Sequence, residues 1–490
     1  MSFAKFFRKT KSIEKRPKSF LDEALYRKVF KEGGTEPLVR KQLNEFFRSS
    51  KRVYKWEVDH TLKKLRQRSL YAPALKLSET MYKRGMNKNV GDKAIHLDLL
   101  AKARGIPAAE EYFVNLPDAA KNHVTYGTLF NCYCQQLMVK EAEALFEKMK
   151  ELQFTTTSMP YNSLMTLYTK IGQPEKVPGI IHEMKSNSIE FGVYTYNVWM
   201  RALAAVNDIS GVERVVEEID RNSEFVGHWT TYSNLASIYV EAGMFEKAES
   251  ALQKLEKLNE RRELSPYLFL ITLYGRVRNL PEVYRVWRSM RLAFPKAANV
   301  SYLNMIQALV NMDDLPGAEN LFKEWESGAV TYDIRIPNVL IGAYTKQGNL
   351  ARAEEVKNQA MRRGAKPNAK TWELFMKFHV KGENFGVAAE CLNNAVAAGN
   401  EVKRKWVPPP EVVEAVMADF EQKSDVEGAE KLAGVLKSSS SELKNKVFES
   451  LIRTYAEAGK TNSLMRRRLK MEKVEVGEEC EKLLQAVCPL

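Results

Sequence analysis

The sequence predicts an all-α protein: a right-handed α-solenoid superhelix of about ten to eleven two-helix repeats. A short phrase, Thr125-Tyr126-Gly127-Thr128-Leu129, returns 35 residues later as Pro160-Tyr161-Asn162-Ser163-Leu164, and again as Thr195-Tyr196-Asn197-Val198-Trp199. Between the copies, apolar residues recur at helical spacing. A fixed period of this length is typical of arrays in which each unit buries its apolar face only by stacking on its neighbours.

Each regular unit contains the pattern of two amphipathic helices. The first helix has apolar residues at its seventh, eighth and eleventh places, as in Leu129, Phe130 and Tyr133. In the second, a small residue precedes two bulky ones, as in Ala142, Phe146 and Met149. These spacings place the apolar side chains on one face of each helix, so the unit is predicted to be a helical hairpin. The predicted units begin at His123, Ser158, Val193, Trp229, Leu264, Asn299, Ile334 and Ala369.

The remaining segments complete a five-part organisation. Residues 1–18 hold seven basic residues and one acidic residue, which predicts a cleaved mitochondrial presequence, with a solvated basic tail as the alternative. At the C-terminus, a linker-like segment from Trp406 is expected to start an atypical copy, and Asn445 is expected to begin a clearer one. The predicted parts are the presequence (1–18), a basic helical N-terminal cap (19–54), two degenerate repeats (55–122), eight regular repeats (123–403), and two degenerate C-terminal repeats with a cap (404–490).

The positive charge of the chain is concentrated at its N-terminus. The formal net charge is +14, and residues 1–70 hold 20 Lys and Arg against 8 Asp and Glu, a local excess of 12. The other 420 residues therefore carry only +2, because 14 − 12 = 2. Unspecific affinity for phosphates comes from clustered Lys and Arg, so the repeat body is not expected to bind nucleic acid by charge alone.

No pattern typical of catalysis, a metal site or a cofactor is present in the sequence. The five cysteines show no C-x-x-C spacing, and the six histidines lie in different units without metal-ligand spacing. There is no glycine-rich phosphate loop, dinucleotide fingerprint or Ser-His-Asp set. No run of 18 apolar residues exists that could cross a bilayer. We therefore expect a non-enzyme without a metal ion, cofactor or membrane insertion.

The details of the repeat resemble those of a known family. Tyr161-Asn162 stands near the start of a unit, Met149 closes a second helix, and a turn with Gly364, Lys366, Pro367 and Asn368 precedes the next copy. The chain resembles the pentatricopeptide repeat family, P class, of the plant organellar type. The related tetratricopeptide repeat is the alternative for individual units.

The resemblance implies that single-stranded RNA binds along the concave face formed by the first helices, one base per repeat. The fifth residue of a unit and the last residue before the next unit would face the base edge, and the second residue, usually Val, would sandwich the base. Only Asn338 with Asn368 is a recognised combination, and Leu268 and Leu303 cannot form a hydrogen bond to a base. The candidate RNA-binding residues in the repeats are Asn162, Asn197, His228, Ser233, Asn338, Asn368, Val124 and Val300.

Basic residues of the N-terminal cap and the first repeat are a second candidate RNA contact. Their density predicts binding to phosphates, although solvation of exposed helices would produce the same composition. The candidates are Arg48, Lys51, Arg52, Lys63, Lys64 and Arg66.

Three functions remain open on these observations. The first is a non-catalytic RNA-binding protein that acts in mitochondrial RNA stability, processing or translation. The second is a structural pentatricopeptide constituent of the mitochondrial ribosome, with ribosomal RNA and ribosomal proteins as partners. The third is a protein–protein scaffold of the tetratricopeptide type. In each case the expected location is the mitochondrial matrix in preference to the chloroplast, and the chain is expected to be a monomer outside any complex.

Overall fold

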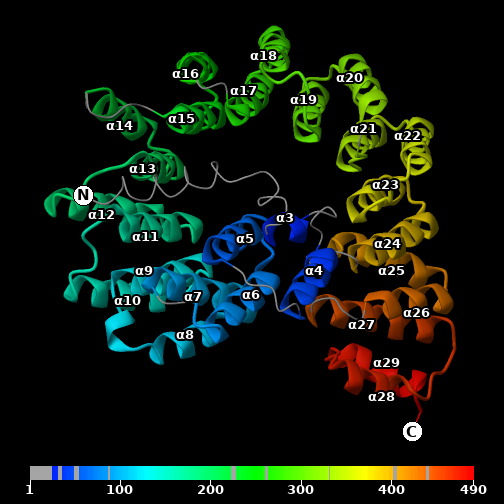
Figure 1. Ribbon diagram of the computed structural model, residues 1–490. Helices are drawn as coiled ribbons and strands as arrows, with labels where there is room; N and C mark the ends of the chain where they lie inside the picture. Colours follow the sequence, from blue (N-terminus) through cyan, green and yellow to red (C-terminus); the bar gives the residue numbers. More distant parts are fainter. Residues whose placement is uncertain are drawn as a thin grey trace. The chain divides into compact units, whose positions relative to one another are not determined.

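The computed structural model describes residues 25–30, 36–48, 54–86, 89–221, 228–259, 263–329, 331–400, 406–436 and 441–489. All regular secondary structure within these ranges is helical, which confirms the all-α prediction (Figure 1). The chain divides into two compact units, Met1–Asn234 and Leu235–Leu490. The predicted presequence (1–18), Lys51 and Arg52 lie outside the described ranges.

Unit 1 is a series of helical hairpins. Its described part starts with two short helices at the predicted cap, and the boundary with unit 2 falls inside α15 (Trp229–Glu241). Two single 3-10 turns, η1 (Asp118–Ala120) and η2 (Pro174–Lys176), interrupt the series. The helices are α3 (Leu25–Phe30), α4 (Glu36–Arg48), α5 (Lys55–Gln67), α6 (Tyr71–Lys83), α7 (Val90–Arg104), α8 (Ile106–Val114), α9 (His123–Gln135), α10 (Val139–Glu151), α11 (Ser158–Lys170), α12 (Val177–Ser186), α13 (Val193–Ala205) and α14 (Ile209–Arg221).

Unit 2 continues with the same element order. Its first helices α17, α19 and α21 lie along one side of the unit, and the second helices α18, α20 and α22 lie along the other (Figure 1). The helices are α16 (Phe245–Lys257), α17 (Leu264–Arg276), α18 (Leu280–Ala293), α19 (Asn299–Asn311), α20 (Leu315–Gly328), α21 (Arg335–Lys346), α22 (Leu350–Arg362), α23 (Ala369–Lys381), α24 (Phe385–Asn400), α25 (Pro410–Gln422), α26 (Val426–Val435), α27 (Ser441–Glu457), α28 (Met465–Glu472) and α29 (Glu478–Val487).

Seven of the eight first helices of the regular units begin at the predicted residue, and the eighth begins one residue later. α21 starts at Arg335, and the preceding Ile334 already has helical backbone angles (φ −56°, ψ −20°), so the difference is a single residue at the helix end. The two C-terminal starts were predicted wrongly. α25 begins at Pro410, because the preceding prolines disfavour the helical conformation, and α27 begins at Ser441, because Leu443 extends its buried face towards the N-terminus.

The apolar face predicted for the first helices forms the core of each unit. In α17, Leu270 and Ile271 are fully buried and Tyr274 is 2% exposed, which are the seventh, eighth and eleventh places. α17 packs against its own second helix, α18, and against the next first helix, α19, and the same arrangement repeats at α19 and α21. Each hairpin therefore buries its apolar stripe against two neighbours, which is the packing of an α-solenoid.

A hydrogen bond between successive repeats recurs in both units. The eleventh-place tyrosine of a first helix donates its hydroxyl to a glutamate on the second helix of the preceding repeat. A hydroxyl at the edge of an otherwise apolar face can reach such a partner without leaving the core. The pairs are Tyr133 with Glu110 (2.7 Å), Tyr168 with Glu143 (2.6 Å), Tyr455 with Glu430 (2.9 Å), and Tyr344 with Glu319.

First helices end in a left-handed turn four residues after that tyrosine. Glycine occupies this place at Gly172 and Gly348, with φ angles of +76° and +79°. Other repeats keep the same backbone with a side chain present, as at Leu137 (φ +60°) and Arg278 (+60°), and at Glu383 (+57°), where the eleventh place holds His379. The turn is therefore required by the hairpin geometry, since glycine is the residue that adopts this conformation with the least strain.

Candidate nucleic-acid interface

Second-place side chains on three consecutive first helices of unit 1, α9, α11 and α13, face solvent. Val124 is 37% exposed, and the same register in the next two units holds Met159 and Tyr194, which are 73% and 58% exposed. In unit 2, Val300 is 42% exposed. The structure therefore leaves Val124 and Val300 accessible, as the resemblance requires. Met159 and Tyr194 were missed, although their position in the repeat was the signal that could have identified them.

Two fifth-place asparagines of unit 1 keep an unsatisfied acceptor. Asn162 is buried and Asn197 is half-buried, and the Oδ1 atom of each is shielded from solvent without a hydrogen-bond partner among the described residues. A buried amide oxygen without a partner is costly, so a donor that reached it would be favoured, but a base could reach these atoms only if the side chains that shield them moved. These two residues keep the polar group that base recognition needs.

The pair expected to recognise a base best is bonded within the chain. Asn338 Nδ2 donates to Asn368 Oδ1 at 3.2 Å, and the Thr371 hydroxyl donates to Asn338 Oδ1 at 2.8 Å. Asn368 Oδ1 also accepts from the Thr371 backbone N–H at 3.0 Å, which caps α23. A base would have to replace these hydrogen bonds, so Asn338 and Asn368 serve the helix cap in this structure.

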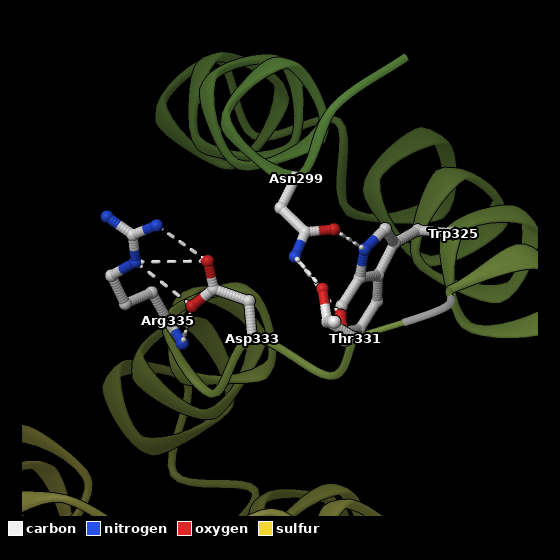
Figure 2. Close-up of polar contacts among 5 residues, drawn as sticks. All are labelled: Asn299, Trp325, Thr331, Asp333 and Arg335. Carbon is white, nitrogen blue, oxygen red and sulfur yellow. Dashed lines mark hydrogen bonds and ion pairs between the residues drawn. The ribbon is translucent and has the colours of Figure 1, made fainter. Parts of the chain in front are cut away.

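Polar side chains also pair with one another at the preceding repeat boundary (Figure 2). Asp333, the base-facing partner of Leu303, binds Arg335, and the closest approach is 2.6 Å between Arg335 Nη2 and Asp333 Oδ2. Hydrogen bonds from Arg335 lower the pKa of the Asp333 carboxyl, which favours its ionised form. With Leu303 unable to bond to a base and Asp333 bound to the second-place arginine, this repeat lacks a free recognition pair.

Asn299, the first residue of α19, forms hydrogen bonds to two residues at this repeat boundary (Figure 2). Its Nδ2 donates to the Thr331 carbonyl oxygen at 3.1 Å, and its Oδ1 accepts from Trp325 Nε1 at 2.9 Å. Trp325 is 2% exposed, so its indole N–H needs a partner. The amide therefore connects the start of one unit to the segment that leads into the next.

The remaining candidates around α15 are held by local contacts. The His228 ring nitrogen Nδ1 accepts from the Thr230 backbone N–H at 3.3 Å and lies 2.9 Å from the Thr230 hydroxyl. Ser233 is 5% exposed. His228 thus acts as a local cap at the start of the helix, and Ser233 belongs to the buried face.

Some basic candidates of the cap and first repeat are exposed, whereas others already contact side chains of the protein. Arg48 and Lys63 are exposed. Lys64 Nζ lies 4.6 Å from the centre of the Tyr26 ring, and Arg66 Nη2 lies 3.0 Å from Asp98 Oδ2. Arg48 and Lys63 are therefore the candidates best able to reach phosphates, whereas Arg66 is engaged in an ion pair.

Further cations stack on the aromatic rings of the cap helices. Arg68 lies 4.4 Å from the centre of the Phe30 ring, and Arg84 lies 5.7 Å from that of Phe46. Arg84 was missed by sequence reasoning, because only the fold brings α6 beside α4. These contacts fix the stems of the cations while both residues remain exposed.

The fourth-place tyrosines are packed inside the hairpins. Tyr161 is 1% exposed, Tyr196 is 4% and Tyr302 is 8%. Tyr161 packs edge-to-face on Phe146, with ring centres 5.3 Å apart. These rings form the core, and stacking on RNA bases would require them to leave it.

Two general searches of the described ranges gave negative results. No group of three or more His, Cys, Asp or Glu side chains there is arranged to hold a metal ion. Among the same residues, the helices are too short or too polar for a bilayer crossing.

Comparison with known proteins shows the family. A PPR repeat family profile matches residues 156–205, and the PPR repeat profile matches residues 124–154, 230–259, 300–328 and 336–364. The large ribosomal subunit protein mL101 (rPPR4) of Arabidopsis thaliana is 58% identical over 98% of this chain and 98% of its own length.

Two further relatives from Arabidopsis thaliana are named as mitochondrial pentatricopeptide repeat-containing proteins. One is 39% identical over 95% of this chain and 87% of its own length, and the other is 37% identical over 91% and 88%. These relatives support the predicted mitochondrial location, and their identity and coverage leave no doubt about the family. The chain is a member of the pentatricopeptide repeat family.

Proposed function

We propose that this protein is a non-catalytic constituent of the large subunit of the mitochondrial ribosome, where it binds ribosomal RNA. The observation that carries the proposal is the 58% identity to a large ribosomal subunit protein, which extends over 98% of both chains. At this coverage the likeness spans the whole repeat array and is not confined to a few repeats. Of the three functions open from the sequence, the second is thus favoured over the first, a factor that binds transcripts.

The geometry of the recognition positions supports the same choice. In unit 2, Asn338 is bonded to Asn368 and Asp333 to Arg335, so these repeats offer no free pair for a base edge. A protein that binds folded RNA over a broad surface does not need a base code. It needs cations that reach phosphates, and Arg48 and Lys63 are exposed at the basic end of the chain.

A transcript-binding role keeps one specific observation in its favour. In two consecutive repeats, the Oδ1 atoms of Asn162 and Asn197 have no hydrogen-bond partner among the described residues, and the exposed Met159 and Tyr194 lie on the same helices. This stretch would accommodate a few unpaired bases, whether of a transcript or of a single-stranded segment of ribosomal RNA. It is too short for strong sequence selection on its own.

Sedimentation of the native protein tests the proposal. Mitochondrial lysate is separated on a sucrose gradient with Mg²⁺ and again after Mg²⁺ is chelated to separate the ribosomal subunits. We expect the protein in the large-subunit fractions both times, also after a high-salt wash. Recovery in light fractions only would favour the transcript-binding factor, and retention of protein partners without RNA crosslinks would favour the scaffold.

A further inference from the structure

A cavity of about 550 Å³ lies in unit 1, away from the base-facing positions of the first helices. It is formed by the last turn of α6, the first half of α7, and α8 with the loop that follows it. Its volume falls within the ~300–1,000 Å³ typical of small-molecule sites. The lining residues are Glu79, Tyr82, Lys83, Lys93, His96, Tyr112, Asn115, Leu116 and Pro117.

The cavity presents an aromatic ring to solvent. Tyr82 is 63% exposed, although a large aromatic side chain is usually buried in a repeat of this kind. Its backbone is fixed, because the N–H of Gly85 donates to the Tyr82 carbonyl at 2.9 Å where α6 ends. The wall beneath is also aromatic, since Tyr112 packs edge-to-face on His96 with ring centres 4.9 Å apart.

The charged side chains that line the cavity give it a net positive charge. Lys83 and Lys93 form no ion pair with a described residue, whereas the one lining carboxylate, Glu79, binds Arg104 at 2.5 Å. The Ser78 hydroxyl holds the His96 ring through Nδ1 at 2.9 Å. Burial lowers the pKa of His96, which disfavours a charge on its ring, so the positive charge of the cavity comes from the two lysines.

We propose that this cavity binds one unstacked nucleotide of RNA, with the base against Tyr82 and the phosphate between Lys83 and Lys93. Aromatic stacking together with basic side chains is the usual way in which proteins hold single nucleotides without reading their sequence. An acidic peptide would match the lysines but would not use the exposed ring. The proposal rests on the proposed function, because it names an RNA contact that a ribosomal constituent makes through α6, α7 and α8.

The test uses the full-length protein and a short RNA hairpin with one bulged adenosine, compared with the same hairpin carrying an abasic bulge. We expect the intact bulge to bind about tenfold more tightly. Tyr82→Ala should reduce this preference to within about twofold, and Tyr82→Phe should keep it. The Lys83→Ala, Lys93→Ala variant should weaken both hairpins, whereas Lys148→Ala, which removes an exposed lysine of α10, should change neither.

Equal binding of the two hairpins by the wild-type protein would overturn the proposal, as would an undiminished preference in Tyr82→Ala. Displacement of the RNA by an acidic peptide, without any effect of the bulged base, would assign the cavity to a protein partner instead. Should Tyr82→Ala not fold, photocrosslinking from a 4-thiouridine bulge to the wild-type protein gives the answer. Crosslinks to the peptides that hold Tyr82 or Tyr112 are expected, and crosslinks only elsewhere would contradict the site.

Failure of this site and failure of the ribosomal role are distinguishable. A Tyr82→Ala protein that has lost its bulge preference but still sediments with the large subunit supports both proposals. A wild-type protein that ignores the bulge and sediments with the large subunit refutes only the nucleotide site. A wild-type protein absent from the large subunit refutes the ribosomal role, whatever the hairpins show.

Discussion

The Tyr168 hydroxyl donates a 2.6 Å hydrogen bond to the Glu143 carboxylate, which lies on the second helix of the preceding repeat. This bond lowers the pKa of Glu143, and Lys176 approaches the same carboxylate at 3.3 Å. Equivalent bonds at Tyr133, Tyr344 and Tyr455 make it a repeated connection between neighbouring hairpins. Because apolar stripes can slide past one another, a directional bond of this kind fixes the register in which hairpins stack.

Removal of one such hydroxyl should destabilise unit 1. Tyr168→Phe keeps the ring, which is 7% exposed, and removes the donor to Glu143. We expect a loss of about 1 kcal/mol, measured as a lower urea midpoint at unchanged slope. Tyr194→Phe is the matched control, since Tyr194 is 58% exposed and should lose little. Equal losses in the two variants would contradict the role of the inter-repeat bond.

The same connection predicts a loss of stability at alkaline pH. Burial, followed by the hydrogen bond to Glu319, raises the pKa of Tyr344 to about 12, from its ordinary value of 10.0. A raised pKa means that the fold favours the neutral phenol. The contribution is therefore complete below about pH 10 and is lost as the pH rises from about 10 to about 12. Urea unfolding at about pH 9 and about pH 11 should show a smaller decline in Tyr344→Phe than in the wild type. Identical declines would mean that Tyr344 does not contribute.

The left-handed turn after the first helix offers a stabilising substitution. Leu137 has a φ of +60° and is 47% exposed, so its side chain adds strain without much burial. Leu137→Gly should raise the free energy of unfolding by about 1 kcal/mol. Leu152→Gly is the control: Leu152 is similarly exposed at 42%, but its φ is −83°, and glycine there should be destabilising. A loss of stability in both variants would show that the turn is not strained.

Exposed cations of the cap and of the first repeat should each contribute a measurable part of the RNA affinity. Arg48→Ala and Lys63→Ala each remove an exposed cation. Each should weaken binding to mitochondrial large-subunit ribosomal RNA and lower the slope of log affinity against log salt by about one. Lys366→Ala removes an exposed lysine of unit 2 and serves as the control. An unchanged slope in both variants, Arg48→Ala and Lys63→Ala, would place the RNA contact elsewhere.

Helix positions could be predicted from the sequence because they depend on short-range regularities. Apolar spacing, the 35-residue period and the glycine after the helix are all read from one segment at a time, and α9, α11 and α13 begin where these signals place them. The predicted start failed where prolines override the period, since α25 begins at Pro410 and not at Trp406.

The sequence could not show which side chains of the site are free to bind RNA, because their hydrogen-bond partners come from other helices. Asn338 looks like a free recognition residue until the fold brings Asn368 and Thr371 against it. Tyr82 in the sequence is one more aromatic residue at helical spacing, and only the packing of α6, α7 and α8 exposes it beside a cavity. Residue types thus indicated which positions are polar, whereas burial and pairing decided which of them remain available.

If this protein is a built-in part of the large subunit, as we propose, its stoichiometry in the purified particle should show it. Large subunits are purified from mitochondria under high salt, and the protein is quantified by mass spectrometry against several ribosomal proteins. The account predicts about one copy per large subunit, because a constituent occupies a single place in each particle. A small fraction of a copy, with most of the protein outside the particle, would contradict it.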